Sequence, residues 1–435
     1  MEVAAFNAES ESVRPPRSSY RWTIVALLFA ATSINYIDRQ VLGILAPTLQ
    51  RELRWTEADY GAIVSWFSLA YGVGLLLVGR AIDRVGVRRG FAYSIVVWSA
   101  AAMAHALART AGGFGFARAL LGLGEAGNFP GSVKAVAEWF PKRERALAIG
   151  IFNAGSNVGA VVAPLLVPWI ALTWGWQEAF LVTGALGLVW LVFWLSIYRE
   201  PERHPRVSAA ELEFIRGDQE EQSGTVRWGA LLTHRQTWAF IAGKAMTDPV
   251  WLFYLFWLPK FLDAEWGVHL AGLAAPLVAI YVLADVGSIG GGWLSSRLIA
   301  RGWTINRSRK TAMFVAALLV VPTIFAPTAP NMWTAVGLVS VAAAAHQAWS
   351  ANLFTSVSDM FPRQAVATVM GIGGFAGAMA GMLFQRVTGY ILDASRSNYA
   401  VIFIIAGTTY VLALLIFHLL VPRMAPAKVE VIEAK

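Results

Sequence analysis

Six of the charged residues inside the long apolar stretches of this sequence form three neighbourhoods: Asp38 and Arg39, Arg118 and Glu125, Lys244 and Asp248. A charged side chain near the centre of a bilayer costs roughly 2.5–3.5 kcal/mol, so each one needs a partner or a task. Arginine and lysine can hold a carboxylate, and a buried carboxylic acid can take up and release a proton. These residue types suit a site that handles an organic anion together with protons.

The spacing of the first four residues limits how they can pair. Adjacent helical residues point about 100° apart, so Asp38 and Arg39 must face different partners. Arg118, Gly122 and Glu125 share one helix face, but Arg118 and Glu125 are about 10 Å apart along the axis. We expect a loose cluster of Asp38, Arg118 and Glu125. Arg39 is then expected to turn into a central cavity toward a substrate carboxylate; the alternative is a purely structural charge network.

Glu125 lies between leucines and glycines in the middle of its apolar stretch. Desolvation there favours the neutral acid over the carboxylate. Such a group can bind a proton on one side of a membrane and lose it on the other. We therefore expect Glu125 to carry the coupled proton.

Lys244 and Asp248 stand four residues apart and are followed by Pro249, whose missing N–H is expected to open the helix. One interpretation is that the two charges neutralise each other. The other is a second anchor across the cavity, with Lys244 on the carboxylate or hydroxyl groups and Asp248 accepting from hydroxyls. In that reading Arg39 and Lys244 are uncompensated cations that bind one anion from opposite sides.

A polar and aromatic run interrupts a later alanine-rich stretch and comprises His346, Gln347, Trp349 and Asn352. Donors and acceptors beside an indole suit a polyhydroxylated ligand, and Tyr71 adds a further candidate hydroxyl contact. Each residue could instead make a polar contact between helices, but their occurrence together favours binding. For Asp285, a bond to a neighbouring helix is slightly favoured over a place in the cavity wall.

The composition requires that these residues be carried by membrane-spanning helices. The 435 residues are 57% hydrophobic and 14% charged, whereas soluble chains are about 25% charged. At about 20 residues per span, the length leaves no room for a separate catalytic domain. Twelve spans are expected, at about 22–48, 57–79, 90–109, 112–138, 146–171, 176–197, 237–262, 271–294, 311–329, 332–357, 366–392 and 399–421.

The basic residues predict the orientation. With both termini in the cytoplasm, 25 of the 35 Lys and Arg fall in inner segments, five in outer loops and five within spans, as the positive-inside rule requires. The expected divisions are a cytoplasmic tail, a six-helix bundle, a cytoplasmic linker, a second six-helix bundle and a second cytoplasmic tail: 1–21, 22–197, 198–236, 237–421 and 422–435.

Two features of the chain support this division. Ser208 and Glu211 form a capping-box pattern that predicts a short amphipathic helix in the linker. Phe140-Pro141 followed by Gly150 matches Phe361-Pro362 followed by Gly371 at a constant offset of 221 residues. This repetition predicts a duplication of six helices.

Several motifs resemble those of one transporter group. Gly79-Arg-Ala-Ile-Asp83-Arg84-Val-Gly86-Val-Arg88-Arg89 resembles the signature loop of the major facilitator superfamily. Asn35-Tyr-Ile-Asp38-Arg39-Gln40 and Arg118-Ala-Leu-Leu-Gly-Leu-Gly-Glu125-Ala-Gly-Asn-Phe-Pro130 resemble its anion:cation symporter family. The stretches 247–251 and 346–354 are similar to those of bacterial hexuronate transporters.

The resemblance implies a major facilitator fold in a bacterial inner membrane and proton-driven uptake of a sugar-acid anion by alternating access. It implies coupling acids at Glu125 and Asp38, and arginines for substrate or coupling at Arg39 and Arg118. The cytoplasmic gate is expected to contain Asp83, Arg84, Arg88 and Arg89. Lys134 and Glu138 are expected to snorkel or to join this layer.

Other classes of function fit less well. Gly122-Leu-Gly-Glu-Ala-Gly127 matches a dinucleotide-binding pattern, but no strand precedes it, so we interpret the glycines as close helix packing. A membrane enzyme and a non-transporting receptor are the rival classes, and neither suits acids at mid-depth. An exporter, a uniporter or a carrier of another carboxylate such as an aldonate stays possible. No cofactor, metal or nucleic-acid partner is expected, and the protein is expected to act as a monomer in the lipid bilayer.

Overall fold

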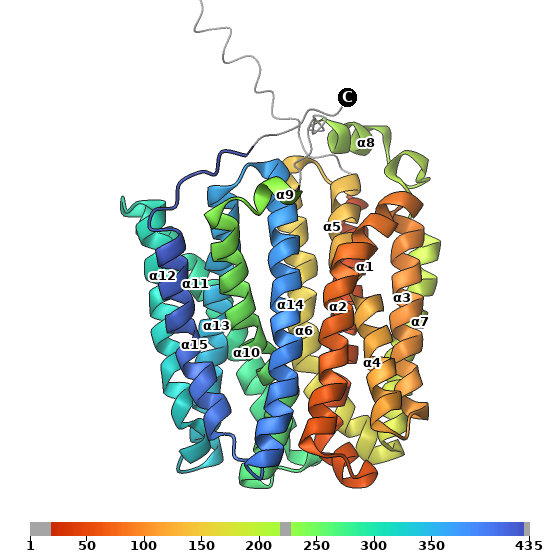
Figure 1. The fold of residues 1–435 in the computed structure, drawn as a ribbon. Helices are drawn as coiled ribbons and strands as arrows, with labels where there is room; N and C mark the ends of the chain where they lie inside the picture. Colours follow the sequence, from red (N-terminus) through yellow and green to blue (C-terminus); the bar gives the residue numbers. More distant parts are fainter. Residues whose placement is uncertain (1–18, 218–227, 430–435) are drawn as a thin grey trace, which may run out of the picture.

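The computed structural model describes residues 19–217 and 228–429, apart from the side chains of residues 83, 142, 143, 146 and 363. These residues form α-helices and short 3₁₀ turns without any strand. Figure 1 shows the long helices running side by side along one axis, with their connections at the two ends. The predicted all-α class is confirmed.

The first half of the chain contains seven of these helices. They are α1 (Arg21–Leu53), α2 (Glu57–Val85), α3 (Val87–Ala104), α4 (Ala111–Glu125), α5 (Asn128–Trp139), α6 (Lys142–Trp174) and α7 (Trp176–Ile197). The segment expected as one span over 112–138 is broken into α4 and α5 at residues 126 and 127. The break follows directly after Glu125, so this carboxyl lies at a helix C-terminus rather than in mid-helix.

The connecting region and the second half contain the other helices. They are α8 (Ala209–Arg216), α9 (Trp228–Leu231), α10 (Arg235–Trp266), α11 (Ala274–Ala300), α12 (Ile305–Val320), α13 (Met332–Met360), α14 (Arg363–Ala394) and α15 (Ala400–Leu420). The helix α10 runs through Pro249 and Pro259 without ending. The expected opening at Pro249 is therefore wrong.

Eight helical segments of the described chain are long and apolar enough to cross a membrane. They are 57–82, 87–107, 147–174, 176–197, 270–300, 305–328, 364–394 and 400–420. The other four expected spans coincide with α1, α4 with α5, α10 and α13. These helices carry the charged and polar candidate residues, and their crossing stays a prediction.

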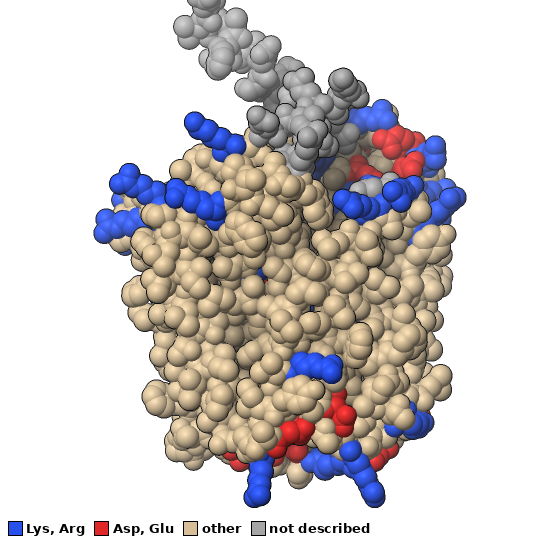
Figure 2. Space-filling view, viewed as in Figure 1, with Lys and Arg blue, Asp and Glu red and all other residues tan. Residues whose placement is uncertain are grey.

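The charged surface follows the same axis. Figure 2 shows Lys and Arg gathered toward the two ends of the molecule, with a broad band of other residues between them. The exposed side chains of that band include leucine, valine and phenylalanine on most of the long helices. An apolar belt between two charged ends is what a lipid bilayer requires.

The two halves meet along three pairs of helices, α1 with α10, α2 with α14, and α6 with α11. Backbones approach closely at Gly61 of α2, where an added Cβ would lie 2.7 Å from the carbonyl oxygen of Gln385. Gly389 of α14 is equally constrained, since its Cβ would lie 2.6 Å from the carbonyl oxygen of Glu57. Only glycine permits this contact between the halves.

The linker helix α8 is fixed to the first half. Ser208 accepts a hydrogen bond from the amide of Glu211, but the Glu211 carboxylate bonds to Arg21 instead of completing the capping box. Arg21 also pairs with Glu144 of α6 at 2.8 Å. Phe214 and Ile215 are buried, as the predicted amphipathic pattern requires. The linker thus packs on the end of the bundle where α1 begins.

Candidate functional site

A buried ion pair joins Arg39 of α1 to Glu125 of α4. The guanidinium Nε donates to the Glu125 carboxylate at 2.8 Å, and both side chains are at least nine-tenths buried. The rings of Tyr36, Phe67 and Tyr71 surround the same guanidinium, with centroids 4.8, 5.2 and 4.9 Å from its carbon. Aromatic faces stabilise the cation without neutralising it, so Glu125 is its one charged partner among the described residues.

This pairing differs from the expected cluster. Arg118 is fully buried and donates from Nη2 to the backbone oxygen of Arg39 at 2.9 Å, and it forms no ion pair with a carboxylate of the described residues. Asp38 is 2% exposed and makes no ion pair with any described residue, and the nearest hydrogen-bonding side chain is that of Thr183 on α7. The reason is the rotation of α1, which turns Arg39 toward α4 and leaves Asp38 on the adjacent face. Arg39 is therefore a compensated cation.

Glycines determine where α4 lies. An added Cβ at Gly122 would lie 2.5 Å from the carbonyl oxygen of Phe67, and at Gly124 it would lie 2.6 Å from the amide nitrogen of Trp98. These contacts hold α4 against both α2 and α3, with Glu125 immediately following. The interpretation of the glycine pattern as close helix packing is confirmed.

The second half holds its own ion pair. Lys244 Nζ lies 2.8 Å from Asp248 on the same face of α10, and its ammonium also lies 4.4 Å from the Phe354 ring centroid. The two charges neutralise each other in this conformation, so the expectation of an uncompensated cation is wrong here too. The Asp248 side chain keeps 21% exposure, which leaves it accessible to a ligand.

The polar run on α13 divides into two groups. His346 bonds to Tyr410 and stacks on Trp251 at 5.0 Å, and Trp349 is fully buried edge-on to Tyr410. Asn352 donates to the backbone oxygens of Gly291 and Ala348. These three make helix–helix contacts, which was the alternative interpretation. Gln347 is partly exposed and has no hydrogen-bond partner among the described residues, whereas the unpaired Trp349 Nε1 and Asn352 Oδ1 are buried.

Asp285 of α11 also differs from the expectation. No hydrogen bond or ion pair joins its carboxylate to any residue of the described chain, although a bond to a neighbouring helix was favoured. The side chain is partly exposed. An acid without a partner therefore lies near the middle of α11.

The expected cytoplasmic gate residues lie at the end of the molecule that carries the linker. Arg84, Arg88 and Arg89 are exposed, and Arg88 donates to the backbone oxygen of Leu195. Glu138 accepts from the Tyr198 hydroxyl at 2.6 Å, and Lys134 is partly buried. The Asp83 side chain lies outside the described residues. The structure does not bring these residues together with the site around Arg39.

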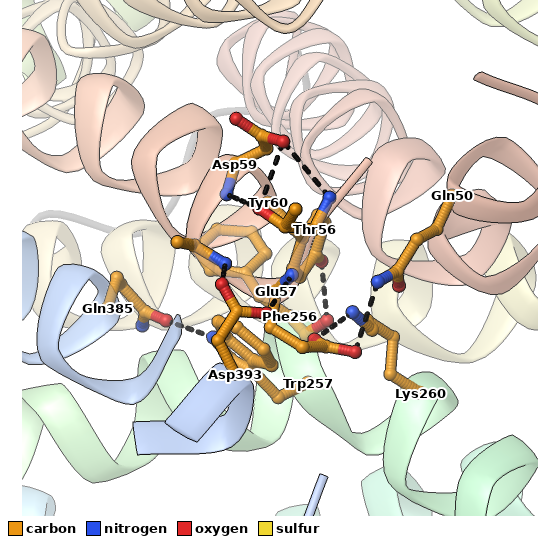
Figure 3. Close-up of polar contacts among 11 residues, drawn as sticks. Gln50, Thr56, Glu57, Asp59, Tyr60, Phe256, Trp257, Lys260, Gln385 and Asp393 are labelled. Carbon is orange, nitrogen blue, oxygen red and sulfur yellow. Dashed lines mark hydrogen bonds and ion pairs between the residues drawn. The ribbon is translucent and has the colours of Figure 1, made fainter. Parts of the chain in front are cut away.

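A cluster at the opposite end, which the sequence did not indicate, joins the two halves. We call it the outer latch and define it as Glu57, Lys260, Asp393, Arg51 and Asp263. Asp393 of α14 accepts from the amides of Glu57 and Ala58 at 2.8 and 2.9 Å and so caps the N-terminus of α2 (Figure 3). A carboxylate at this position also interacts favourably with the dipole of α2.

The latch is strengthened by buried charges. Lys260 of α10 is 4% exposed, pairs with Glu57 (Figure 3), and has its ammonium 4.8 and 5.2 Å from the ring centroids of Tyr60 and Trp257. Arg51 pairs with Asp263 at 2.9 Å beside it. Among the described side chains, the ion pairs and hydrogen bonds between the two helical bundles all lie at this end. This end of the molecule is closed.

The outer latch leads to a prediction about how readily a reagent reaches the interior of the protein from this end. Replacing Lys260 with Met leaves Glu57 buried without its cation, and losing one partner of a buried pair costs about 3–5 kcal/mol. In a Ser68→Cys background, Lys260→Met should raise the rate of labelling by an impermeant maleimide from the latch side by about tenfold or more. Ser68 is buried and lies 4.0 Å from a Cβ added at Gly381 of α14. An unchanged rate, with Ser397→Cys labelled normally, would show that the pair does not hold this end closed.

Comparisons with known proteins identify the class and then the family. The arrangement of helices matches that of a bacterial homologue of the human lysosomal transporter Spinster in an inward-facing conformation, with a TM-score of 0.75 at 19% identity over 93% of this chain and 97% of the other. It matches the D-xylose–proton symporter with a TM-score of 0.73 at 17% identity over 93% and 99%. The chain therefore has the fold that these two transporters share.

The chain belongs to the Major Facilitator Superfamily, whose family model matches residues 28–385. It is 34% identical to the hexuronate transporter of Escherichia coli K12 over 86% of this chain and 88% of the relative. It is 34% identical to the galacturonate transporter of Dickeya chrysanthemi over 69% and 89%, and 32% identical to a probable galactarate/D-glucarate transporter of Bacillus subtilis over 93% and 92%. The protein is a transporter and not an enzyme.

Proposed function

We propose that this protein imports a hexuronate such as glucuronate or galacturonate together with protons by alternating access. The observation that carries the proposal is the buried pair of Arg39 and Glu125. Arg39 can bind either Glu125 or a substrate carboxylate with its full charge, but not both. Protonation of Glu125 would release Arg39 for the substrate, so the proton and the anion would bind the same state.

The cycle follows from this competition. On the acidic outer side, Glu125 takes up a proton and the carboxylate binds Arg39. On the inner side, at higher pH, Glu125 loses its proton and displaces the anion from Arg39. Asp38 is proposed as a second titrating acid, and Arg118 supports the pair through the backbone of Arg39.

The second half is proposed to bind the hydroxyl end of the sugar. Lys244 and Asp248 can exchange their mutual ion pair for contacts with hydroxyl groups, and Gln347 offers an amide. Tyr71, whose ring covers Arg39, is proposed as a hydroxyl contact from the first half. His346, Trp349 and Asn352 would reach the substrate only after the helix contacts described above rearrange.

A second candidate substrate is a dicarboxylic or aldonic sugar acid. The relatives that support it are the probable galactarate/D-glucarate transporter of Bacillus subtilis and a D-galactonate transporter of Escherichia coli, which is 28% identical over 89% of this chain. Counterflow of labelled glucuronate in proteoliposomes, with galacturonate, galactarate and galactonate as competitors, separates the candidates. Competition by galacturonate alone supports the first, and absence of both glucuronate counterflow and galacturonate competition would reject it.

We further propose that the protein lies in the bacterial inner membrane as a monomer, with both termini and the linker in the cytoplasm. This assigns the outer latch to the periplasmic face. The chain contains no cysteine, so single cysteines report on topology directly. In intact cells, an impermeant maleimide should label Ser397→Cys but should label Ser18→Cys only after permeabilisation. The reverse pattern would contradict the orientation.

A further inference from the structure

We propose that Asp285 of α11 lies in the wall of the transport passage and selects monocarboxylic over dicarboxylic sugar acids. The inference deepens the proposed function and rests on it. The Asp285 carboxylate has no hydrogen-bond or ion-pair partner among the described residues, so its contacts give it no structural role.

The contacts of α11 indicate the direction in which the Asp285 side chain points. Gly287 and Gly291 pack directly on Ala344 and Ala348 of α13, while Val286 and Ile289 are exposed on the apolar belt. Tyr281 precedes Asp285 by one turn and faces Trp251 of α10, with ring centroids 6.4 Å apart. Asp285 lies about 40° round the helix from buried Tyr281 and about 40° in the other direction from exposed Ile289, so it stands at the border between the α10 side and the exposed side.

Helix register places Asp285 at the depth of Arg39. Arg51 contacts Asp263, and Gly43 contacts the backbone of Phe256, so α1 and α10 rise in parallel. Arg39 is therefore level with Trp251, which contacts Tyr281. Asp285 follows Tyr281 by about 6 Å along α11. The acid of the second half and the arginine of the first half thus lie within about one helical turn in depth.

The energetics of burial exclude a lipid-facing position. An unpaired carboxylate in contact with hydrocarbon costs roughly 2.5–3.5 kcal/mol at mid-depth, and nothing near Asp285 offsets that cost. A partly exposed acid at this depth is stable only where water or a polar ligand reaches it. The water-accessible space between the two halves is the transport passage itself.

The charges of the passage then explain what Asp285 does. Arg39, Arg118 and Lys244 supply three positive charges at mid-depth, whereas Asp38, Glu125, Asp248 and Asp285 supply four potential negative charges. Arg39 would hold one carboxylate of the substrate. A hydroxyl at the far end of the sugar can donate to Asp285, but a second carboxylate there would meet a like charge without a cation to offset it. Uronates, which have one carboxylate, are therefore accepted, and aldarates, which have two, are rejected.

Counterflow of labelled glucuronate in proteoliposomes tests the proposal, with unlabelled galacturonate and galactarate as competitors. The measured quantity is the ratio of the galactarate inhibition constant to the galacturonate constant. Asp285→Asn keeps the shape and removes the charge, and it should lower this ratio by about tenfold, mainly through tighter galactarate binding. Asp285→Glu restores the charge and should keep the wild-type ratio.

Three results are decisive. A ratio within about twofold of wild type in Asp285→Asn would overturn the proposal, as would loss of proton-driven uptake in that variant with an unchanged ratio. If Asp285→Asn does not insert, Asp285→Ser supplies the same comparison with a smaller neutral side chain. Wild-type protein that neither exchanges labelled glucuronate nor is inhibited by galacturonate would reject the proposed function instead, so the two failures are distinguishable.

Discussion

Proteoliposomes that contain Glu125→Gln are expected to exchange hexuronate across the membrane but not to accumulate it against a gradient. The amide resembles the protonated acid, so Arg39 stays free for the substrate at every pH. Binding and counterflow should persist, and their pH dependence between about pH 5 and 8 should flatten because the competing carboxylate is gone. Proton-driven accumulation should fall to the level of empty liposomes.

The control is Glu213→Gln, the same substitution at an exposed position on α8. It should retain wild-type counterflow and wild-type accumulation. If Glu125→Gln accumulates substrate as wild type does, Glu125 is not the coupling acid. Asp38, which is buried and makes no ion pair with any described residue, would then be the next candidate.

Arg39→Ala is expected to weaken hexuronate binding by about a hundredfold or more, measured by calorimetry on the purified protein. Removing one partner of a buried, charge-assisted contact costs about 2–5 kcal/mol. Arg39→Lys should recover only part of the loss. An ammonium cannot make two parallel hydrogen bonds to a carboxylate, and it lacks the flat guanidinium group that packs against the rings of Tyr36 and Tyr71.

The structure adds a complication to this experiment, because Arg39→Ala also leaves Glu125 buried without its cation. The double variant Arg39→Ala/Glu125→Gln removes both charges and separates the two effects. Binding should stay weak in the double variant. Recovery of wild-type affinity there would mean that the single variant failed through misfolding, and that Arg39 does not hold the carboxylate.

Much of the architecture could be predicted from the sequence because it depends on properties that single residues carry. Apolar length predicts helices, Gly122 and Gly124 predict close packing, and Phe140-Pro141 with Phe361-Pro362 predict the duplication. The break after Glu125 was missed, because its residues, alanine and glycine, are common in membrane helices. Pro249 led to the opposite error: the sequence predicted an opening of the helix there, but α10 continues past it.

The partners of the charged residues could not be predicted, because they depend on how helices rotate about their axes. A rotation of α1 by one residue, about 100°, decides whether Asp38 or Arg39 meets Glu125. The outer latch was missed for a related reason. Glu57, Lys260 and Asp393 each stand near a helix end, where charges are common, and nothing in their spacing indicates that three helices bring them together.

The most direct test of the account is uptake of labelled glucuronate into proteoliposomes with an alkaline interior and an acidic exterior. Proton-coupled import predicts that the internal concentration rises above the external one, and that a protonophore abolishes the rise. It also predicts that added glucuronate carries protons inward, seen as acidification of the interior. Glucuronate that only equilibrates across the membrane, with the same final level with and without the pH gradient, would contradict proton-coupled import.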